Sequence, residues 1–367
     1  MTRVSGHLGD WLQFRNGKSS PERTPSGKFP VFGSNGEIGR ANVSNVEQSA
    51  TVIGRVGSYC GSTWYSTGPA WVTDNAIIAT AADSGESRFW YYALRFLDLN
   101  RVSHGSGQPL LNQTTLRELP FTAPAPPERL AIAATLGALD DKVESNRRTI
   151  SMIDELVRAR FQTDFDMSQA ADGVSVADLV PVNRKLKLSR GKKATYIGMS
   201  SLPEFSPEIL DWESREFGSG QKFVNGDVLM ARITPCLENG KTAIVDMLED
   251  GEVGWGSTEY VVLSPKGLIT TPWIYALARH ELVREWAIRR MTGTSGRQRF
   301  QAAGFSDDRI AEPDQKRLEE FNSFAVPLFN RITQLRNEIR RLTSLRDTLL
   351  PELLSGRVSM PVGEVAS

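Results

Sequence analysis

Two stretches with the same apolar spacing decide the fold: LAIAATLGALDDKVESNRRTISMIDELV at residues 130–157 and FNSFAVPLFNRITQLRNEIRRL at residues 321–342. In both, apolar side chains recur at alternating steps of four and three residues. Each seam position of the first stretch, moved on by 189 residues, falls on a seam position of the second. This spacing keeps one stripe of a helix facing a partner helix, as in a coiled coil. We therefore predict two long helices that pack against each other.

The predicted seam is apolar except at one position. Asn146 either fixes the register of the pair at some cost in stability or lies at an exposed edge. An ordinary amphipathic helix, packed on its own domain, is the alternative for each stretch, but the matched register favours a pair. The seam consists of Ile132, Leu136, Leu139, Val143, Asn146, Ile150 and Ile153 in the first helix and Phe321, Ala325, Leu328, Ile332, Leu335, Ile339 and Leu342 in the second.

Prolines and a glycine suggest where the helices begin and end. Pro126 and Pro127 suit a helix start, where a missing N–H costs nothing, and Gly356 suits a C-terminal cap. Pro327 and Pro351 lie inside the second pattern, so we expect them to kink or divide that helix. A helix of about 33 residues spans roughly 50 Å, which is typical of a spacer.

The segment before each long helix has a different amino-acid composition. It is rich in glycine and in short β-branched or aromatic runs, which predicts short strands separated by turns, with helices near residues 87–97 and 272–288. The chain is therefore expected to have an α+β fold with a pseudo-twofold internal repeat. We place its boundaries at 1–122 and 164–312 for the globular domains, 123–163 and 313–357 for the long helices, and 358–367 for a C-terminal tail.

Composition limits the classes of function. The 43 basic and 43 acidic side chains cancel, so any nucleic acid must be held by local patches. Cys60 and Cys236 are too few and too far apart for a disulfide framework or a cysteine-based zinc site. No stretch is apolar enough for a signal peptide or a membrane span, so we expect a cytoplasmic protein.

Signals of catalysis are missing from the sequence. No Walker-type loop occurs, and the GSNGEIG run at residues 33–39 precedes no convincing helix. Three scattered histidines, His7, His104 and His280, make a histidine metal site or a nucleophile–histidine triad improbable. A hidden pair of acid and base carboxylates stays open. We expect a non-enzyme that has no metal or cofactor of its own.

Two polar segments in the second half suit nucleic acid. The run NRKLKLSRGKK at residues 183–193 is either a solvated surface or a contact to phosphates. The run GTSGRQRF at residues 293–300 contains two arginines, which can bond guanine, and a glutamine, which can bond adenine. The shift of 189 residues places HGSGQPLL, residues 104–111, opposite it, so each long helix follows a polar loop.

These loops and further polar strand ends supply the candidate DNA-binding residues. For each one, a purely local role in capping a turn is the alternative. The candidates are Ser34, Asn35, Arg55, Ser58, Tyr59, Thr73, Asn75, Ser106, Gly107 and Gln108 in the first half, and Lys185, Lys187, Arg190, Lys192, Arg232, Thr234, Ser257, Thr258, Ser295, Gly296, Arg297, Gln298 and Arg299 in the second.

Over nearly its whole length the sequence resembles the DNA-specificity (S) subunits of type I restriction–modification systems. The likeness rests in the first half on LGDWLQFRNGKS, FPVFGSNGEIGR, IGRVGSYCG, WVTDNA, GSGQPLLNQTTLRELPFTAPAPPE and LGALDDKVESN. In the second half it rests on YIGMSSL, GDVLMARITPCLENGKTAIV, STEYVVL, TSGRQRF and LRDTLLPELLSGRV. The order of these patterns and the doubled layout make the resemblance specific. The first long helix departs from the family pattern, because it closes with RARFQTDFD instead of a GxxSG-like end.

The resemblance implies a mechanism. Each globular segment would be a target recognition domain that reads one half of a bipartite sequence in double-stranded DNA. The two helices would pack antiparallel and set the gap between the half-sites. Two methyltransferase subunits would bind the chain and supply S-adenosylmethionine, and restriction subunits would join through them. A coiled-coil adaptor whose globular domains bind proteins or peptides is the alternative.

Overall fold

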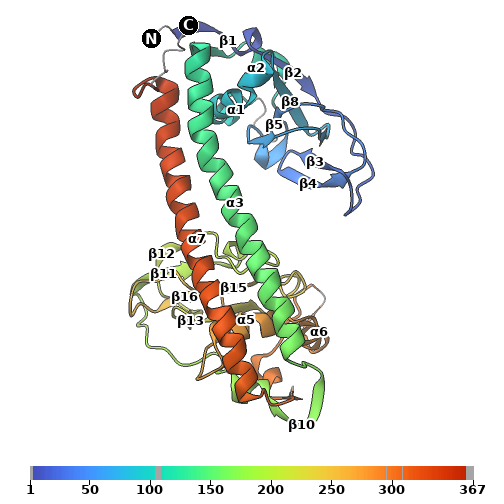
Figure 1. The fold of residues 1–367 in the computed structure, drawn as a ribbon, viewed down its shortest axis with the longest axis vertical. Coiled ribbons are helices and arrows are strands. Elements are labelled where there is room, and N and C mark those ends of the chain that lie inside the picture. Colours follow the sequence, from blue (N-terminus) through green and yellow to red (C-terminus); the bar gives the residue numbers. More distant parts are fainter. Residues whose placement is uncertain (1–2, 104–108, 295, 308, 361–367) are drawn as a thin grey trace. The chain divides into compact units, whose positions relative to one another are not determined.

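The computed structural model describes residues 3–103, 109–294, 296–307 and 309–360 (Figure 1). Two compact units divide the chain. Unit 1 comprises Met1–Glu144 and Ile339–Ser367, and unit 2 comprises Ser145–Glu338. Two long helices, α3 (Pro126–Asp164) and α7 (Gln315–Ser355), each contribute one part to unit 1 and the other part to unit 2.

Unit 1 is built on two small sheets with the strand orders β2-β8-β5-β6 and β4-β3-β7, and β1 pairs with β9. Helix α1 (Ser87–Phe96) packs on the first sheet, and the short helix α2 (Gln113–Arg117) follows. The strands are β1 (Arg3–His7), β2 (Leu12–Asn16), β3 (Phe29–Gly33), β4 (Gly36–Ala41), β5 (Ala50–Gly54), β6 (Thr63–Ser66), β7 (Trp71–Val72), β8 (Ala76–Ala81) and β9 (Pro120–Pro124).

Unit 2 has sheets with the orders β12-β11-β16-β13 and β15-β14-β17, and β10 pairs with β18. Its helices are α4 (Val176–Leu179), α5 (Thr271–Arg279) and α6 (Glu281–Arg289). The strands are β10 (Gln169–Ser175), β11 (Lys193–Ile197), β12 (Glu213–Glu216), β13 (Gln221–Phe223), β14 (Val228–Ala231), β15 (Thr242–Ile244), β16 (Gly254–Gly256), β17 (Tyr260–Leu263) and β18 (Arg309–Ile310).

The two units repeat one pattern of strand pairing. In unit 1 the central strand β5 pairs antiparallel with β6 and β8, and in unit 2 β14 pairs antiparallel with β15 and β17. The second sheet of each unit joins one parallel pair, β3 with β7 and β11 with β16, to an antiparallel neighbour, β4 or β12. The mixed α/β architecture expected from the sequence is confirmed.

Burial explains why these short segments form strands. Every residue of β5, β14 and β17 is buried, so their sequences ATVIG, VLMA and YVVL are nearly continuous apolar runs rather than alternating ones. In unit 1 the same core includes Ile132 and Leu136 of α3 and Leu353 of α7. The long helices are therefore part of the globular core and do not stand apart from it.

Within unit 2 the parts of α3 and α7 run in opposite directions. Asn146 Nδ2 donates to Glu338 Oε2 at 3.0 Å, the Phe161 and Phe321 rings lie 5.9 Å apart, and Arg317 Nη1 donates to the Asp164 carbonyl at 3.2 Å. Asn146 is 2% exposed, so an exposed edge, one of its two alternatives, is excluded.

The seam positions differ in burial. Ile132, Leu136, Val143, Asn146, Ile150, Ile153, Phe321, Ile332 and Leu335 are buried, whereas Leu139, Leu328, Ile339 and Leu342 are half-buried.

The expectation that prolines divide the second helix is wrong, because α7 is one helix from Gln315 to Ser355. A proline removes the hydrogen bond to the carbonyl four residues earlier. Pro327 and Ser323 are both exposed, and so is Asp347, which precedes Pro351 by four residues. The freed carbonyls therefore lie on the solvent side of the helix, where water can bond them.

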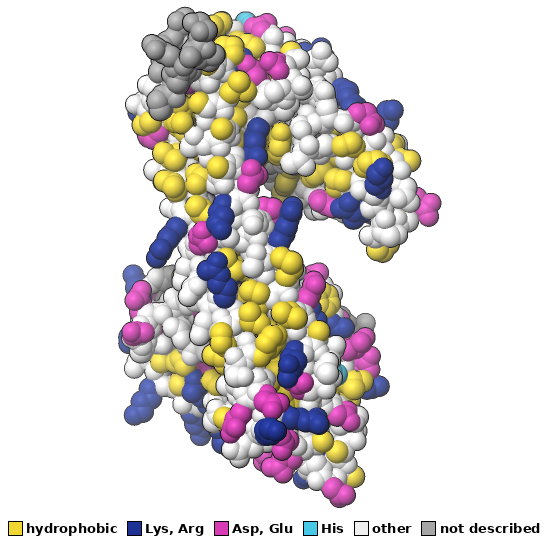
Figure 2. Space-filling model, in the orientation of Figure 1, with side chains coloured by type: hydrophobic (Ala, Val, Ile, Leu, Met, Phe, Trp, Pro, Cys, Tyr) yellow, Lys and Arg dark blue, Asp and Glu magenta, His cyan; other side chains and the backbone are white. Residues whose placement is uncertain are grey.

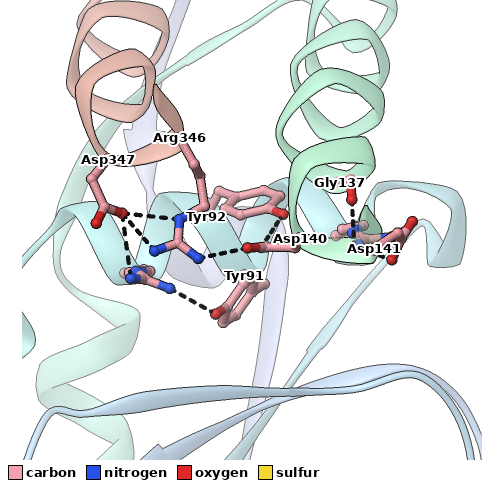
Figure 3. A network of polar contacts seen from close by, with 9 residues as sticks. Tyr91, Tyr92, Gly137, Asp140, Asp141, Arg346 and Asp347 are labelled. Carbon is pink, nitrogen blue, oxygen red and sulfur yellow. Dashed lines mark hydrogen bonds and ion pairs between the residues drawn. The ribbon is translucent and has the colours of Figure 1, made fainter. Parts of the chain in front are cut away.

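A polar network ties three helices of unit 1 together (Figure 3). Asp140 of α3 accepts hydrogen bonds from Tyr92 Oη of α1 and from Arg346 Nη1 of α7, both at 2.6 Å. Arg346 also donates to Asp347 Oδ1 at 2.7 Å. Burial and the Asp140 carboxylate raise the pKa of Tyr92, so its hydroxyl stays a donor. The network fixes the register of α3, α7 and α1.

Candidate nucleic-acid interface

In unit 1 the structure brings several predicted residues together at the ends of β3, β5 and β7. Arg55 follows β5, and its backbone N–H donates to the Asn75 carbonyl at 2.9 Å, while its Nη1 reaches the Asp74 carbonyl at 3.3 Å. Thr73 is 2% exposed and donates its N–H to Phe32, so its side chain does not face solvent. Asn75 itself is exposed.

Two further turns join this group. Ser34 is half-buried and Asn35 is exposed at the tip of the β3–β4 hairpin, and Ser58 and Tyr59 are exposed in the turn Gly57–Tyr59. A Cβ added to Gly54 would lie 2.1 Å from the Tyr59 carbonyl oxygen and 2.7 Å from that of Ser34. Only glycine permits this approach of three backbone segments. The predicted Ser106, Gly107 and Gln108 lie outside the described residues.

Unit 2 repeats the backbone frame of this surface bond for bond. In unit 1, Arg55 N donates to Asn75 O and Leu111 N donates to Arg55 O. In unit 2, Arg232 N donates to Glu259 O at 3.0 Å and Phe300 N donates to Arg232 O at 2.8 Å.

In both units the backbone frame includes one further hydrogen bond. Gly57 N donates to Pro109 O at 3.3 Å, and Thr234 N donates to Gln298 O at 3.1 Å. Residues 109 and 298 differ by the same 189 positions that relate the two long helices. The segments that begin at Pro109 and at Gln298 are thus equivalent in structure as well as in sequence spacing.

The loop of unit 2 combines exposed and tethered side chains. Gly296, which has a φ of 78°, Arg297 and Gln298 are exposed. Thr234 is half-buried, and its Oγ1 is a buried atom without a hydrogen-bond partner among the described residues. Ser257 Oγ accepts from Glu259 N at 3.1 Å, which is a local turn contact, and Thr258 is exposed. The predicted Ser295 lies outside the described residues.

A carboxylate that the sequence reasoning did not select as a candidate lies inside this group. Arg299 Nε donates to both oxygens of Glu259, at 2.9 and 3.0 Å, and Arg232 Nε donates to one of them at 3.3 Å. At the equivalent positions unit 1 has Asn75 and Leu110. The signal for Glu259 in the sequence was its place in GSTEY, the counterpart of VTDNA.

The basic run is not part of this group. Lys185, Lys187, Arg190 and Lys192 are exposed in the loop before β11. Ile197, at the far end of β11, pairs with Gly256, which directly precedes Ser257. Likewise Arg184 forms an ion pair with Asp227 before β14, whereas Arg232 follows β14. The run therefore lies at the opposite ends of the strands from Arg232 and Glu259.

Among the residues that the structure describes, no group of three or more His, Cys, Asp or Glu side chains is arranged to hold a metal ion. Burial raises the pKa of both Cys60 and Cys236, so neither thiol is activated as a nucleophile. In the described part of the chain, no helix combines the length and apolarity that crossing a membrane requires.

Residues 4–155 match the family model described as a type I restriction modification DNA specificity domain. This match covers less than half of the chain and shows that its first part is similar to the DNA specificity domains of type I restriction–modification systems. The resemblance predicted from the sequence is therefore confirmed.

Similar proteins include the EcoAI specificity subunit of Escherichia coli, 27% identical over 190 residues that cover 49% of this chain and 31% of that subunit. The MjaIX specificity subunit of Methanocaldococcus jannaschii is 23% identical over 308 residues, 75% of this chain and 70% of that subunit. The matches span less than a third of EcoAI and 26% of the similar EcoEI subunit of E. coli.

A crystal structure of a type I restriction–modification S subunit from M. genitalium has the same fold, with a TM-score of 0.60, 17% identity and 96% of both chains covered. The expectation that the chain groups with DNA-specificity components and not with enzymes is confirmed by the family model and these relatives.

Proposed function

We propose that this chain is the specificity subunit of a type I restriction–modification complex and reads a bipartite target in double-stranded DNA. Residues 1–122 and 164–312 would be its two target recognition domains. The long helices, predicted at 123–163 and 313–357, would pack as an antiparallel pair that holds these domains at a set spacing, and residues 358–367 would be a tail.

The observation that carries this proposal is the repeated loop frame. Both units hold the same three strand-end segments by equivalent backbone hydrogen bonds, yet the side chains on that frame differ. Because base sequence is read by side chains at groove edges, one frame with two sets of side chains suits two different half-sites.

Within each unit we assign different tasks to the exposed residues. Asn35, Ser58 and Tyr59 in unit 1 and Arg297 and Gln298 in unit 2 lie on or beside the shared backbone frame and would face the bases. The basic run lies at the far ends of the strands, so its lysines and arginines would contact backbone phosphates and hold the duplex without reading its sequence.

Partners would supply the chemistry. Two methyltransferase subunits would bring S-adenosylmethionine, restriction subunits would join through them, and the complex would work in the cytoplasm. The face drawn in Figure 2 has basic and acidic side chains interspersed, in line with the balanced charge of the chain. Much of the electrostatic attraction for DNA would therefore come from the partner subunits.

Selection of binding sites from a randomised duplex pool, with the partner methyltransferase present, tests the proposal. We expect two short fixed blocks around a gap of constant length. Alanine at Arg297 and at Gln298 should relax the second block and leave the first unchanged. One contiguous block, or binding that ignores DNA sequence, would contradict the proposal; binding to a protein partner that persists without DNA would favour an adaptor.

A further inference from the structure

The Glu259 carboxylate lies between the two arginines of the unit 2 surface. It accepts from Arg299 Nε through both oxygens and from Arg232 Nε through one. The three side chains are 21%, 36% and 23% exposed, so the cluster is partly shielded from solvent. Two cations share one anion, which leaves a net positive charge at this point of the surface.

A carboxylate at this position needs a reason, because it repels the phosphates of a bound duplex. The backbone frame does not require it. Unit 1 builds the same frame with the uncharged Asn75, whose carbonyl accepts from Arg55 N as the Glu259 carbonyl accepts from Arg232 N. The reason must therefore lie in the Glu259 side chain and in the arginines it bonds.

The two arginines are tethered to different degrees. Arg299 is held at two nitrogens, because its Nη1 also donates to the Arg297 carbonyl at 3.1 Å. Arg232 is held at Nε alone. Among contacts with described residues, neither Nη1 nor Nη2 of Arg232 has a partner, and neither is a buried atom. Its two terminal nitrogens therefore reach solvent as a pair.

That free pair has the geometry of a base-reading fork. Two terminal guanidinium N–H groups match the O6 and N7 acceptors of guanine in the major groove. An arginine held at Nε by a carboxylate keeps its fork in one orientation and loses less conformational entropy when it binds. In unit 1 Arg55 uses Nη1 on the Asp74 carbonyl, so it does not offer the same pair.

We propose that Glu259 is a positioning residue that sets the base preference of unit 2 by holding Arg232, whose fork reads a guanine of the second half-site. This inference rests on the proposed function and extends it to one residue pair. Arg299 completes the clamp and does not itself read a base.

Site selection from randomised duplexes, with the full chain and its methyltransferase subunits, tests the pair. Wild type should enrich a guanine at one position of the second block. Glu259→Gln and Arg232→Lys should each reduce that preference about ten- to hundredfold, because lysine keeps the charge but lacks the fork. The first block reports that each variant complex is folded and assembled.

Glu213→Gln is the matched control. Glu213 also pairs with an arginine of unit 2, Arg215, but both lie on β12, which is not one of the three segments of the loop frame. Its replacement changes net charge by the same amount and should leave both blocks as in wild type.

Three results would overturn the inference and leave the proposed function standing. Weaker binding of all sequences by equal factors would make Arg232 a phosphate contact. A preference lost in Glu259→Gln but kept in Arg232→Lys would mean that Glu259 reads cytosine directly. Unchanged preferences in both variants would remove the role altogether. If wild type selects no bipartite site, the proposed function fails together with the inference.

Discussion

His280 joins two helices of unit 2 and has an unusual environment. It follows the last residue of α5 and precedes the first residue of α6, and its ring lies 6.1 Å from that of Phe161. Its Nδ1 is buried without a hydrogen-bond partner among the described residues. Burial lowers the pKa of His280 below its ordinary value of 6.5, against smaller opposing effects of Glu281 and Asp166.

The depressed pKa makes the stability of unit 2 depend on pH. Below about pH 6.5 the unfolded chain binds a proton at this histidine that the folded chain resists, so the free energy of unfolding should fall as pH drops through that window. Denaturant titrations between about pH 7.5 and about pH 5.5 measure this slope. His280→Asn should flatten this slope. If His280→Asn kept the wild-type slope, His280 would not be the source of the pH dependence.

At the scale of single residues, sequence could predict which side chains bind but not which ones are already engaged. Arg299 was as good a candidate as Arg297 from its type and neighbours. Only the fold brings Glu259, some forty positions earlier, against it. The basic run was likewise a fair candidate surface. Its separation from Arg297 and Arg299 depends on strand pairings between distant segments, which local sequence patterns do not encode.

At the scale of elements, the heptad spacing was the most reliable signal. It predicted two long helices because a seven-residue period persists over several turns and each turn adds independent support. The expectation that the prolines would divide the second helix was wrong, because the sequence does not say which side of a helix faces water. The same spacing continues past the seam to Arg346 of α7, which is 9% exposed and donates to Asp140 of α3. Burying such a charged pair destabilises the fold unless both charges are well hydrogen-bonded.

The Asp140–Arg346 pair should matter most when only one partner is removed. Asp140→Ala leaves Arg346 with Asp347 alone and Tyr92 Oη without its acceptor, so the free energy of unfolding should fall by about 2–4 kcal/mol. The double variant Asp140→Ala with Arg346→Met removes both charges, so its free energy of unfolding should fall by less. Denaturant unfolding of the full chain measures this free energy for both variants.

The exposed pair of Asp98 and Arg101 is the control for this comparison. Their side chains are 55% and 83% exposed, so Arg101→Ala should change the unfolding free energy by less than about 1 kcal/mol. A loss for Asp140→Ala no larger than that of the control would mean that the network does not lock the helices.

At the scale of the whole molecule, the two units share the same strand pairings around β5 and β14, although their sequences are only weakly alike. The order of the chain, in which a globular segment and a long helix occur twice, could be predicted from composition and from the seven-residue spacing. The pairing of β5 with β8 or of β14 with β17 was not, because buried apolar strands can pair in many registers with little change in pattern. That each unit contains parts of both long helices could not be read from the sequence either.

The spacer role assigned to α3 and α7 predicts how the target changes with their length. Seven residues inserted into both helices, after Glu144 and after Glu338, keep the seam in phase and add about 10 Å to each. The gap between the selected half-sites should lengthen by up to about three base pairs, while both blocks keep their sequence. A seven-residue insertion after the exposed Gly251 is the control and should leave the gap unchanged. An unchanged gap in the helix variant would refute the spacer role.

The division of the chain also sets an order of events during synthesis. Unit 2 is contiguous, from Ser145 to Glu338, so all of its residues are synthesised before α7 is complete. The core of unit 1 joins Leu8 and Leu12 to Leu353 and Leu354, which are added more than three hundred residues later. Domains usually fold in the order in which they are made. Here the later unit can close first, whereas the core of the earlier unit is complete only when the last turns of α7 have been added.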